Sequence, residues 1–279
     1  MGSKRKAWIQ QPVTEEEFLF KYARRDGTGD ARGDDWAEKL AAELAALLGI
    51  ATPPVELATR RNERGVVCRR MADPDLTQLV HGNELLARID PAYADSPLRN
   101  NPHYTVGAVR ACLAGSTAKL PGRADADAFD LWVGYLVLDA WIANTDRHHE
   151  NWGVLVDQRT DGSRLAPSFD HGSSLGFNVS PALLPVLLDE PGRLERWCAK
   201  GHSAYFAGKP SLVDVASEAL ASAGSRTREL WLARLDAVRP DDWERLVARV
   251  TDERMSEPTR TFVTGMLSVN RRRVLDVRR

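Results

Sequence analysis

The chain has 279 residues, a formal net charge of −1 and 43% hydrophobic residues. It is long enough to bury a large core and to form two lobes or domains. The near-neutral charge provides no global basic field, so we predict no direct nucleic-acid binding. Three widely spaced cysteines indicate a reducing compartment, hence a cytoplasmic protein. No apolar segment follows the basic residues 1–6, so we expect no signal peptide there, and the sequence has no run of about 18 apolar residues that could span a membrane.

The first predicted elements form a small sheet. Residues 2–9 begin with a glycine and cations and continue as a short strand, and residues 17–23 alternate as a second strand. The second strand carries Lys21 among apolar residues. Such a lysine is either an edge residue that reaches solvent or a cation that binds a partner. Residues 55–58 and 66–71 predict a hairpin.

A helix is expected over residues 35–48. Its predicted core stripe consists of Trp36, Leu40, Leu44 and Leu47. Glu38 lies away from this stripe, beside alanines that allow close approach of another surface. Two interpretations stay open for it: a partner for Lys21, or a capping box with Asp35 at the helix start. Glu43 is the rival partner for the lysine.

The most informative stretch begins with a helix, expected over residues 127–143, that is apolar on nearly every side and therefore buried. It leads into a polar loop at residues 144–151, Asn-Thr-Asp-Arg-His-His-Glu-Asn, and an apolar strand follows. Because unpaired polar groups are costly to bury, this loop must be partly solvated or hold a ligand. The preceding residues, 75–127, are expected to be mostly helical.

A second stretch, residues 165–169, is a short apolar run directly before Asp170-His171-Gly172. With residues 154–156 it predicts a hairpin that brings Asp146, Asn151 and Asp170 together. This spacing matches the phosphoryl-transfer template, in which one Asp orients or deprotonates the acceptor hydroxyl and an Asn and a second Asp hold metal. Magnesium prefers such oxygen ligands and keeps several waters, so two protein ligands suffice.

The string N-x-D-R-H-x-x-N, followed by Asp-His-Gly, resembles the HipA-like serine/threonine kinases of bacterial toxin–antitoxin systems, over their C-terminal kinase core. Its D-R-H-x-x-N part also occurs in phosphatidylinositol kinases. The resemblance implies an α+β, two-lobed, protein-kinase-like fold with ATP and Mg²⁺ as cofactors. The N-terminal lobe, with a sheet and one helix, would cover residues 1–73, and the helical C-terminal lobe residues 74–279.

The resemblance also implies roles in nucleotide binding. Lys21, placed by Glu38, would bind the α/β-phosphates, and Asn151 and Asp170 would hold Mg²⁺. Gly2 stands where the family carries a glycine-rich segment that covers the phosphates. It would be either an abbreviated form of that segment or part of a frayed terminus.

For the acceptor side, the resemblance implies that Asp146 accepts or orients the proton of the acceptor hydroxyl. His148, two residues later, would either steady developing charge or brace the loop by a hydrogen bond. The segment after Gly172, rich in serine and proline, resembles an activation segment. Four helices are expected to follow, over residues 212–223, 227–235, 241–250 and 258–277.

The implied reaction is transfer of the ATP γ-phosphoryl group to a serine or threonine of a protein, such as a translation component. A toxin of this kind would have a cognate antitoxin as a partner. Three alternatives remain: a phosphatidylinositol-kinase-like enzyme, a small-molecule kinase with a different acceptor pocket, and a nucleotide-binding pseudokinase that acts as an interaction module. The presence of the base, the lysine and both metal ligands argues against the pseudokinase.

Overall fold

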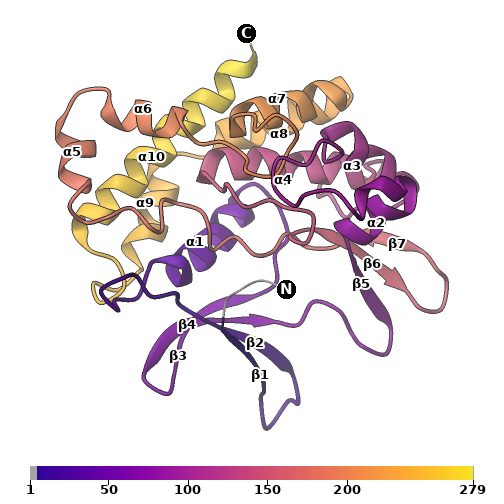
Figure 1. The fold of residues 1–279 in the computed structure, drawn as a ribbon, viewed down its shortest axis with the longest axis horizontal. Coiled ribbons are helices and arrows are strands. Elements are labelled where there is room, and N and C mark those ends of the chain that lie inside the picture. The colour runs from indigo at the N-terminus through magenta and orange to yellow at the C-terminus, as the bar shows by residue number, and fades with distance from the viewer. Residues whose placement is uncertain (1–4, 279) are drawn as a thin grey trace.

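The computed structural model describes residues 5–278. An antiparallel sheet of N-terminal strands lies on one side of the molecule, and the helices of the rest of the chain lie on the other (Figure 1). A helix from the N-terminal region, α1, lies between them (Figure 1). The predicted α+β fold, with an N-terminal sheet lobe and a helical C-terminal part, is confirmed.

The first sheet has the order β1-β2-β4-β3. Its strands are β1 (Lys6–Gln10), β2 (Glu17–Tyr22), β3 (Val55–Arg60) and β4 (Glu63–Arg69). Side chains alternate along β2, so Phe20 and Tyr22 are buried together while Lys21 faces the other side. The strand and hairpin predicted here are confirmed, with ends shifted by a few residues.

Helix α1 (Asp34–Leu47) packs against β3 and β4. Trp36, Leu40 and Leu44 are buried as predicted, but Leu47 is 38% exposed, so its assignment to the core was wrong. The fully buried residue is Leu48. The stripe follows steps of four residues, and the step of three to Leu47 rotates that side chain to the edge of the contact.

A second, three-stranded sheet has the order β5-β6-β7. It consists of β5 (Thr77–His81), β6 (Gly153–Asp157) and β7 (Ser163–Leu165). The expectation that residues 75–127 are mostly helical was wrong. Besides β5, this region contains only α2 (Gly82–Ile89), α3 (Val106–Cys112), the 3-10 turn η1 (Pro91–Tyr93) and long irregular connections. The hairpin of β6 and β7 was predicted, but its second strand is Ser163–Leu165 and not residues 165–169.

Helix α4 (Ala128–Ile142) forms the centre of the helical part, where it packs on α7 and α10. All of its residues except Asp130 are buried, which explains why its sequence is apolar apart from Asp130 and Asp139. The helix ends at Ala143 in the left-handed conformation (φ 54°), and this turns the chain into the 144–151 loop. A buried helix of four turns provides a rigid support for that loop.

The remaining helices are α5 (Leu184–Asp189), α6 (Arg193–Ala199), α7 (Leu212–Ser222), α8 (Ser225–Ala237), α9 (Pro240–Ala248) and α10 (Glu257–Leu275), followed by the 3-10 turn η2 (Asp276–Arg278). The last four α-helices match the predicted ones closely, whereas α5 and α6 were not predicted. None of the helices in the described part of the chain is both long enough and apolar enough to cross a membrane.

Candidate active site

A cavity of about 780 Å³ lies between the first sheet and the helical part. Its walls come from β1, β2, α1 and β4 on one side, and from β5, α2 and the segments around β6 and β7 on the other. The predicted site residues that line it are Lys21, Glu38, His148, Asn151 and Asp170. Cys68–Met71, at the end of β4 and just beyond it, also line it. Gly2 lies outside the described residues, so its role stays a prediction.

Lys21 is held inside this cavity by two carboxylates. Its Nζ lies 3.0 Å from Asp170 Oδ1 and 3.4 Å from Glu38 Oε1, and its side chain is 15% exposed. Burial alone lowers the pKa of this ammonium, but the charges of Asp170 and Glu38 outweigh burial and hold the pKa above its usual value. The lysine is therefore charged, and it is not extended into solvent.

Glu38 joins α1 to the segment after Asp170. Its second carboxylate oxygen, Oε2, accepts a hydrogen bond from the amide of Gly172 at 2.7 Å. The segment also contacts the start of α1, because the Gly33 amide donates to the carbonyl of Phe177 at 3.0 Å. These bonds place the carboxylate of α1, the lysine of β2 and Asp170 in one cluster.

The structure does not support the two alternatives for the α1 carboxylates, a capping box of Asp35 with Glu38 and a pairing of Glu43 with Lys21. Asp35 makes no capping bond; its buried carboxylate is paired with Arg64 at 2.8 Å and Arg254 at 2.6 Å. The capping-box interpretation was therefore wrong. Glu43 pairs with Lys39 at 2.8 Å on the same helix, so it is not the partner of the cavity lysine.

The 144–151 loop is built on a buried ion pair. Arg147 donates two hydrogen bonds to the carboxylate of Asp139 on α4, at 2.7 and 2.8 Å, and both side chains are 3% exposed. The same guanidinium donates to the carbonyl of Asn151 at 2.7 Å and to Ser168 Oγ at 3.1 Å. One side chain therefore ties the loop both to its supporting helix and to the residues that precede Asp170.

Replacing Arg147 tests this support. We expect Arg147→Met to lower the free energy of unfolding by about 3–5 kcal/mol, because it leaves Asp139 as an unpaired buried charge. Arg193→Met is the matched control, since Arg193 forms an exposed pair with Glu190 that contributes only about 0–1 kcal/mol. Urea denaturation of the two variants gives the comparison. Equal stabilities would show that the buried pair does not support the loop.

Asp146 and Asn151 are joined through the backbone of this loop. The amide of Asp146 donates to Asn144 Oδ1 at 3.2 Å, and Asn151 Nδ2 donates to the carbonyl of Asp146 at 2.7 Å. The Asp146 carboxylate accepts a hydrogen bond from the hydroxyl of Tyr205. Asn151 thus uses its amide nitrogen within the loop, and its amide oxygen is the atom left for a cation.

His148 forms the bracing hydrogen bond that was one of its two interpretations. Its Nδ1 accepts from the amide of Glu150 at 3.2 Å, and its ring centre lies 5.0 Å from that of Tyr205. Burial lowers the pKa of His148, so the ring is neutral near pH 7. A neutral ring braces the loop without adding positive charge to the cavity.

A magnesium ion fits the donors that the 144–151 loop and the segment after β7 provide. Asp170 (φ 60°) and Asn151 both line the cavity and offer carboxylate and amide oxygens, the ligands that magnesium prefers. Within residues 5–278, no group of three or more His, Cys, Asp or Glu side chains is arranged to hold a metal. A cation at these two residues must therefore take further oxygen ligands from water or from a bound phosphate.

Several residues of the site were not predicted. The acid Asp139 in an otherwise apolar helix was a usable signal, because such a residue is rarely buried without a partner. His171 is buried, with Nε2 2.8 Å from Ser168 Oγ, and burial, followed by the charge of Arg147, lowers its pKa to about 3. The sequence around Tyr205 contains no motif that would indicate a role in the site.

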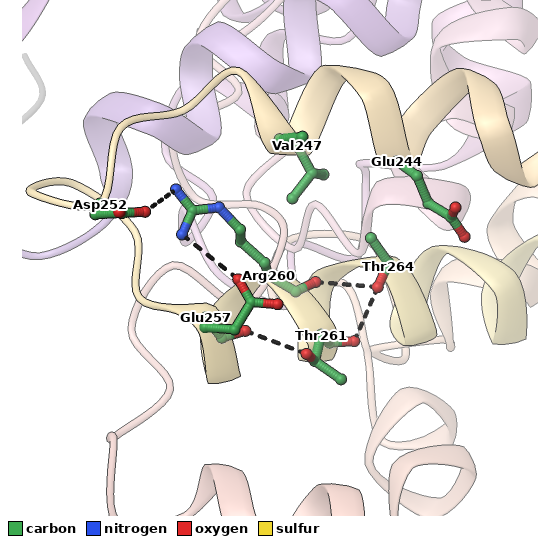
Figure 2. A pocket seen from close by; sticks show the side chains of 8 residues that line it. Glu244, Val247, Asp252, Glu257, Arg260, Thr261 and Thr264 are labelled. Carbon is green, nitrogen blue, oxygen red and sulfur yellow. Dashed lines mark hydrogen bonds and ion pairs between the residues drawn. The ribbon is translucent and has the colours of Figure 1, made fainter.

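A second hollow, of about 400 Å³, lies between α9 and α10 (Figure 2). Figure 2 shows Arg260 directed toward Asp252 and Glu257, and the two carboxylates lie 2.9 and 3.9 Å from it. The cation of this hollow is therefore already balanced by its own neighbours. The hollow contains none of the predicted site residues, and the cavity between sheet and helices remains the candidate active site.

Comparisons with known sequences and structures bear on the family and the fold of the chain. Residues 1–188 match the family model of the HipA-like C-terminal domain. No curated protein sequence matches the chain. The crystal structure of the Helicobacter pylori proinflammatory kinase CtkA is similar, with a TM-score of 0.78 and 18% identity over 99% of this chain and 91% of that chain.

A structure of the Shewanella oneidensis MR-1 toxin–antitoxin system, with HipA, HipB and operator DNA, is also similar. Its TM-score is 0.60 and its identity 12%, over 99% of this chain and 66% of that chain. At these identities the two structures show a shared fold. Since the family model covers well over half of the sequence and includes the whole N-terminal sheet, the 144–151 loop and Asp170, the chain belongs to the HipA-like C-terminal domain family.

Proposed function

We propose that the protein is an ATP- and magnesium-dependent kinase of the HipA-like type. The observation that carries this proposal is the cluster in the cavity, where Lys21 contacts both Glu38 and Asp170 beside the loop of Asp146 and Asn151. These residues come from four separate segments of the chain. Their combination of one cation, one positioned carboxylate and two metal-type oxygen donors is what phosphoryl transfer requires.

On the nucleotide side, Lys21 is proposed to bind the α- and β-phosphates, with Glu38 holding its ammonium in place. Asn151 and Asp170 are proposed to hold Mg²⁺, which when bound neutralises charge on the transferring phosphate. The lysine and Asp170 form an ion pair and neutralise each other. A bound nucleotide would compete for the lysine and leave Asp170 available to the cation.

On the acceptor side, Asp146 is proposed to orient the acceptor hydroxyl and to take its proton. The transition state of phosphoryl transfer is loose, so most of the catalytic effect comes from positioning and charge neutralisation. The fixed backbone of the 144–151 loop meets this need. His148 is proposed to support the loop beside the base.

We also propose residues 1–73 as the nucleotide-binding lobe and 74–279 as the lobe that carries the catalytic and metal-binding loops. The pairing of β5 with β6 supports this division. Strand β5 begins at Thr77, shortly after residue 73, and it belongs to the second sheet and not to the first. The proposed acceptor is a serine or threonine of a protein. Family membership supports this choice, and it also motivates the proposal of a toxin with a cognate antitoxin.

A panel of acceptors tests the function. The unaltered chain is incubated with γ-labelled ATP, magnesium and either proteins, phosphoinositide vesicles or small hydroxyl compounds. We expect label on serine or threonine of protein. Label on the lipid or on a small molecule would replace the protein-kinase assignment with one of the alternative kinases. Binding of ATP without transfer to any acceptor would favour the pseudokinase.

The toxin role needs a separate test. We expect the chain to slow growth when it is expressed alone, and its Asp146→Asn variant to have no effect. Equal growth of cells that express the two forms, at matched protein levels, would contradict the toxin role without affecting the kinase assignment. Co-expression with the product of an adjacent gene, followed by co-purification, would identify the antitoxin.

Lys21→Met is expected to weaken binding of ATP–magnesium by about 10- to 100-fold, because a charge-assisted hydrogen bond contributes about 1.5–3 kcal/mol. Lys39→Met is the matched control. Lys39 also contacts two carboxylates, those of Glu43 and Glu56, but it does not line the cavity. Titration calorimetry of both variants checks the result. Similar affinities would mean that the Lys21 ammonium does not contact the nucleotide.

A further inference from the structure

The carboxylate of Asp146 is held by a residue from a distant loop. Its backbone is fixed within the 144–151 loop, but within residues 5–278 the hydrogen-bond donor to its side chain is the hydroxyl of Tyr205, 59 residues further along the chain. A carboxylate that is fixed only at its backbone can still rotate about its side-chain bonds. The contact with Tyr205 restricts this rotation.

Tyr205 itself is firmly placed. Its side chain is buried, its amide donates to Ser203 Oγ at 3.3 Å, and its carbonyl accepts from the amide of Asn101 at 2.9 Å. The guanidinium of Arg99 lies 5.7 Å from the centre of its ring, and the ring of His148 packs at 5.0 Å. The hydroxyl is therefore presented to Asp146 by a ring that has contacts on several sides.

The neighbouring residue ties the same segment to the catalytic loop a second time. The ring centre of Phe206 lies 4.3 Å from that of Tyr104, and the Tyr104 hydroxyl donates to the carbonyl of Arg147 at 3.2 Å. Tyr104 also accepts a hydrogen bond from Trp152 Nε1 at 2.9 Å. The segment that carries Tyr205 is thus linked through Tyr104 to Arg147, the residue after Asp146.

We propose that Tyr205 is a positioning residue for phosphoryl transfer, which fixes the orientation of the Asp146 carboxylate toward the acceptor hydroxyl. This proposal rests on the proposed function. The tyrosine binds Oδ1, and a carboxylate offers about four lone-pair sites on two oxygens, so Oδ2 stays available for the acceptor. The tyrosine therefore orients the base without occupying the whole of it.

The direction of the hydrogen bond follows from the protonation states. Burial, and after it the carboxylate of Asp146, raise the pKa of Tyr205, so the phenol keeps its proton and donates. Displacing a reacting group by about 1 Å can cost about 10²-fold in rate. Loss of one of the restraints on Asp146 should cost less than this, so we expect a decrease of about 10-fold.

Tyr205→Phe tests the proposal, with Tyr135→Phe as the matched control. Tyr135 is also a buried tyrosine, and its hydroxyl donates to the carbonyl of Ala166 at 2.8 Å, so its variant loses a comparable hydrogen bond. Magnesium-dependent ATP turnover of the full chain is measured with water as acceptor. We expect kcat to fall about 10-fold in Tyr205→Phe with KM for ATP unchanged, and both constants to be unchanged in Tyr135→Phe.

A double variant distinguishes positioning from a general effect on the fold. If Tyr205 acts through Asp146, Tyr205→Phe should have no further effect on the residual turnover of Asp146→Ala. The proposal would be overturned if Tyr205→Phe lowered turnover by the same factor in the unaltered chain and in Asp146→Ala. It would also be overturned if kcat were unchanged in Tyr205→Phe alone. Neither result would affect the kinase assignment. If the unaltered chain neither turns over ATP nor labels an acceptor, the proposed function and this inference fail together.

Discussion

Asp170→Asn is expected to lower magnesium-dependent ATP turnover by roughly 10³-fold while the fold survives. The change keeps the size of the side chain but removes the negative charge that is proposed to hold the cation. Asn also tolerates the left-handed backbone at this position (φ 60°), so the substitution adds little strain. It also weakens the contact with Lys21, whose Nζ lies 3.0 Å from Oδ1.

The matched control for this variant is Asp161→Asn. Asp161 has nearly the same backbone conformation (φ 56°), but it is exposed in the turn between β6 and β7. Turnover and its dependence on magnesium concentration are measured for both variants, with thermal unfolding as a check of folding. An Asp170→Asn variant with the turnover and magnesium dependence of the control would remove Asp170 from the metal site.

Asp146→Asn should have a different effect: near-normal binding of ATP–magnesium, but loss of phosphoryl transfer by about 10²–10⁴-fold. The base is proposed to touch the acceptor hydroxyl and to make no required contact with the nucleotide. The asparagine keeps an oxygen that can accept the hydrogen bond of Tyr205, so the variant removes basicity and charge without removing that contact.

Calorimetry of nucleotide binding and transfer assays measure the two properties of Asp146→Asn separately. If the variant loses ATP binding as well, Asp146 has a role on the nucleotide side and the proposed division of tasks is wrong. If it still transfers phosphate at the normal rate, the 144–151 loop does not carry the reaction. Asp170→Asn, which is expected to lose turnover and also its response to magnesium, provides the contrast.

The parts of the site that could be predicted are those that depend on the spacing of residues close together in the sequence. Alternation along one strand placed Lys21 opposite its buried neighbours, and the loop with Asp146 and Asn151 stands between a mostly apolar helix and an apolar strand. The hairpin of β6 and β7 then brings Asp170 to the same cavity. Glu38 was harder to assign, because a capping box and an ion pair have the same local sequence.

The parts that could not be predicted depend on contacts between distant segments. The five residues of β5 become a strand by pairing with β6, more than seventy residues further on, and strand preference depends strongly on such partners. Tyr205 lies 59 residues after Asp146, beyond α5 and α6, so their contact depends on the tertiary fold. The bidentate pair of Arg147 and Asp139 is local, but its importance follows from the burial of both side chains.

The most direct test of the central claim, that the cavity between sheet and helices transfers the γ-phosphoryl group of ATP, compares two labelled nucleotides. The unaltered chain is incubated with magnesium and a protein acceptor mixture, once with γ-labelled and once with α-labelled ATP. We expect that γ-label becomes covalently attached to protein, that α-label does not, and that removing magnesium with a chelator abolishes the transfer. Attachment of the α-label, or attachment of the γ-label that persists without magnesium, would contradict the central claim.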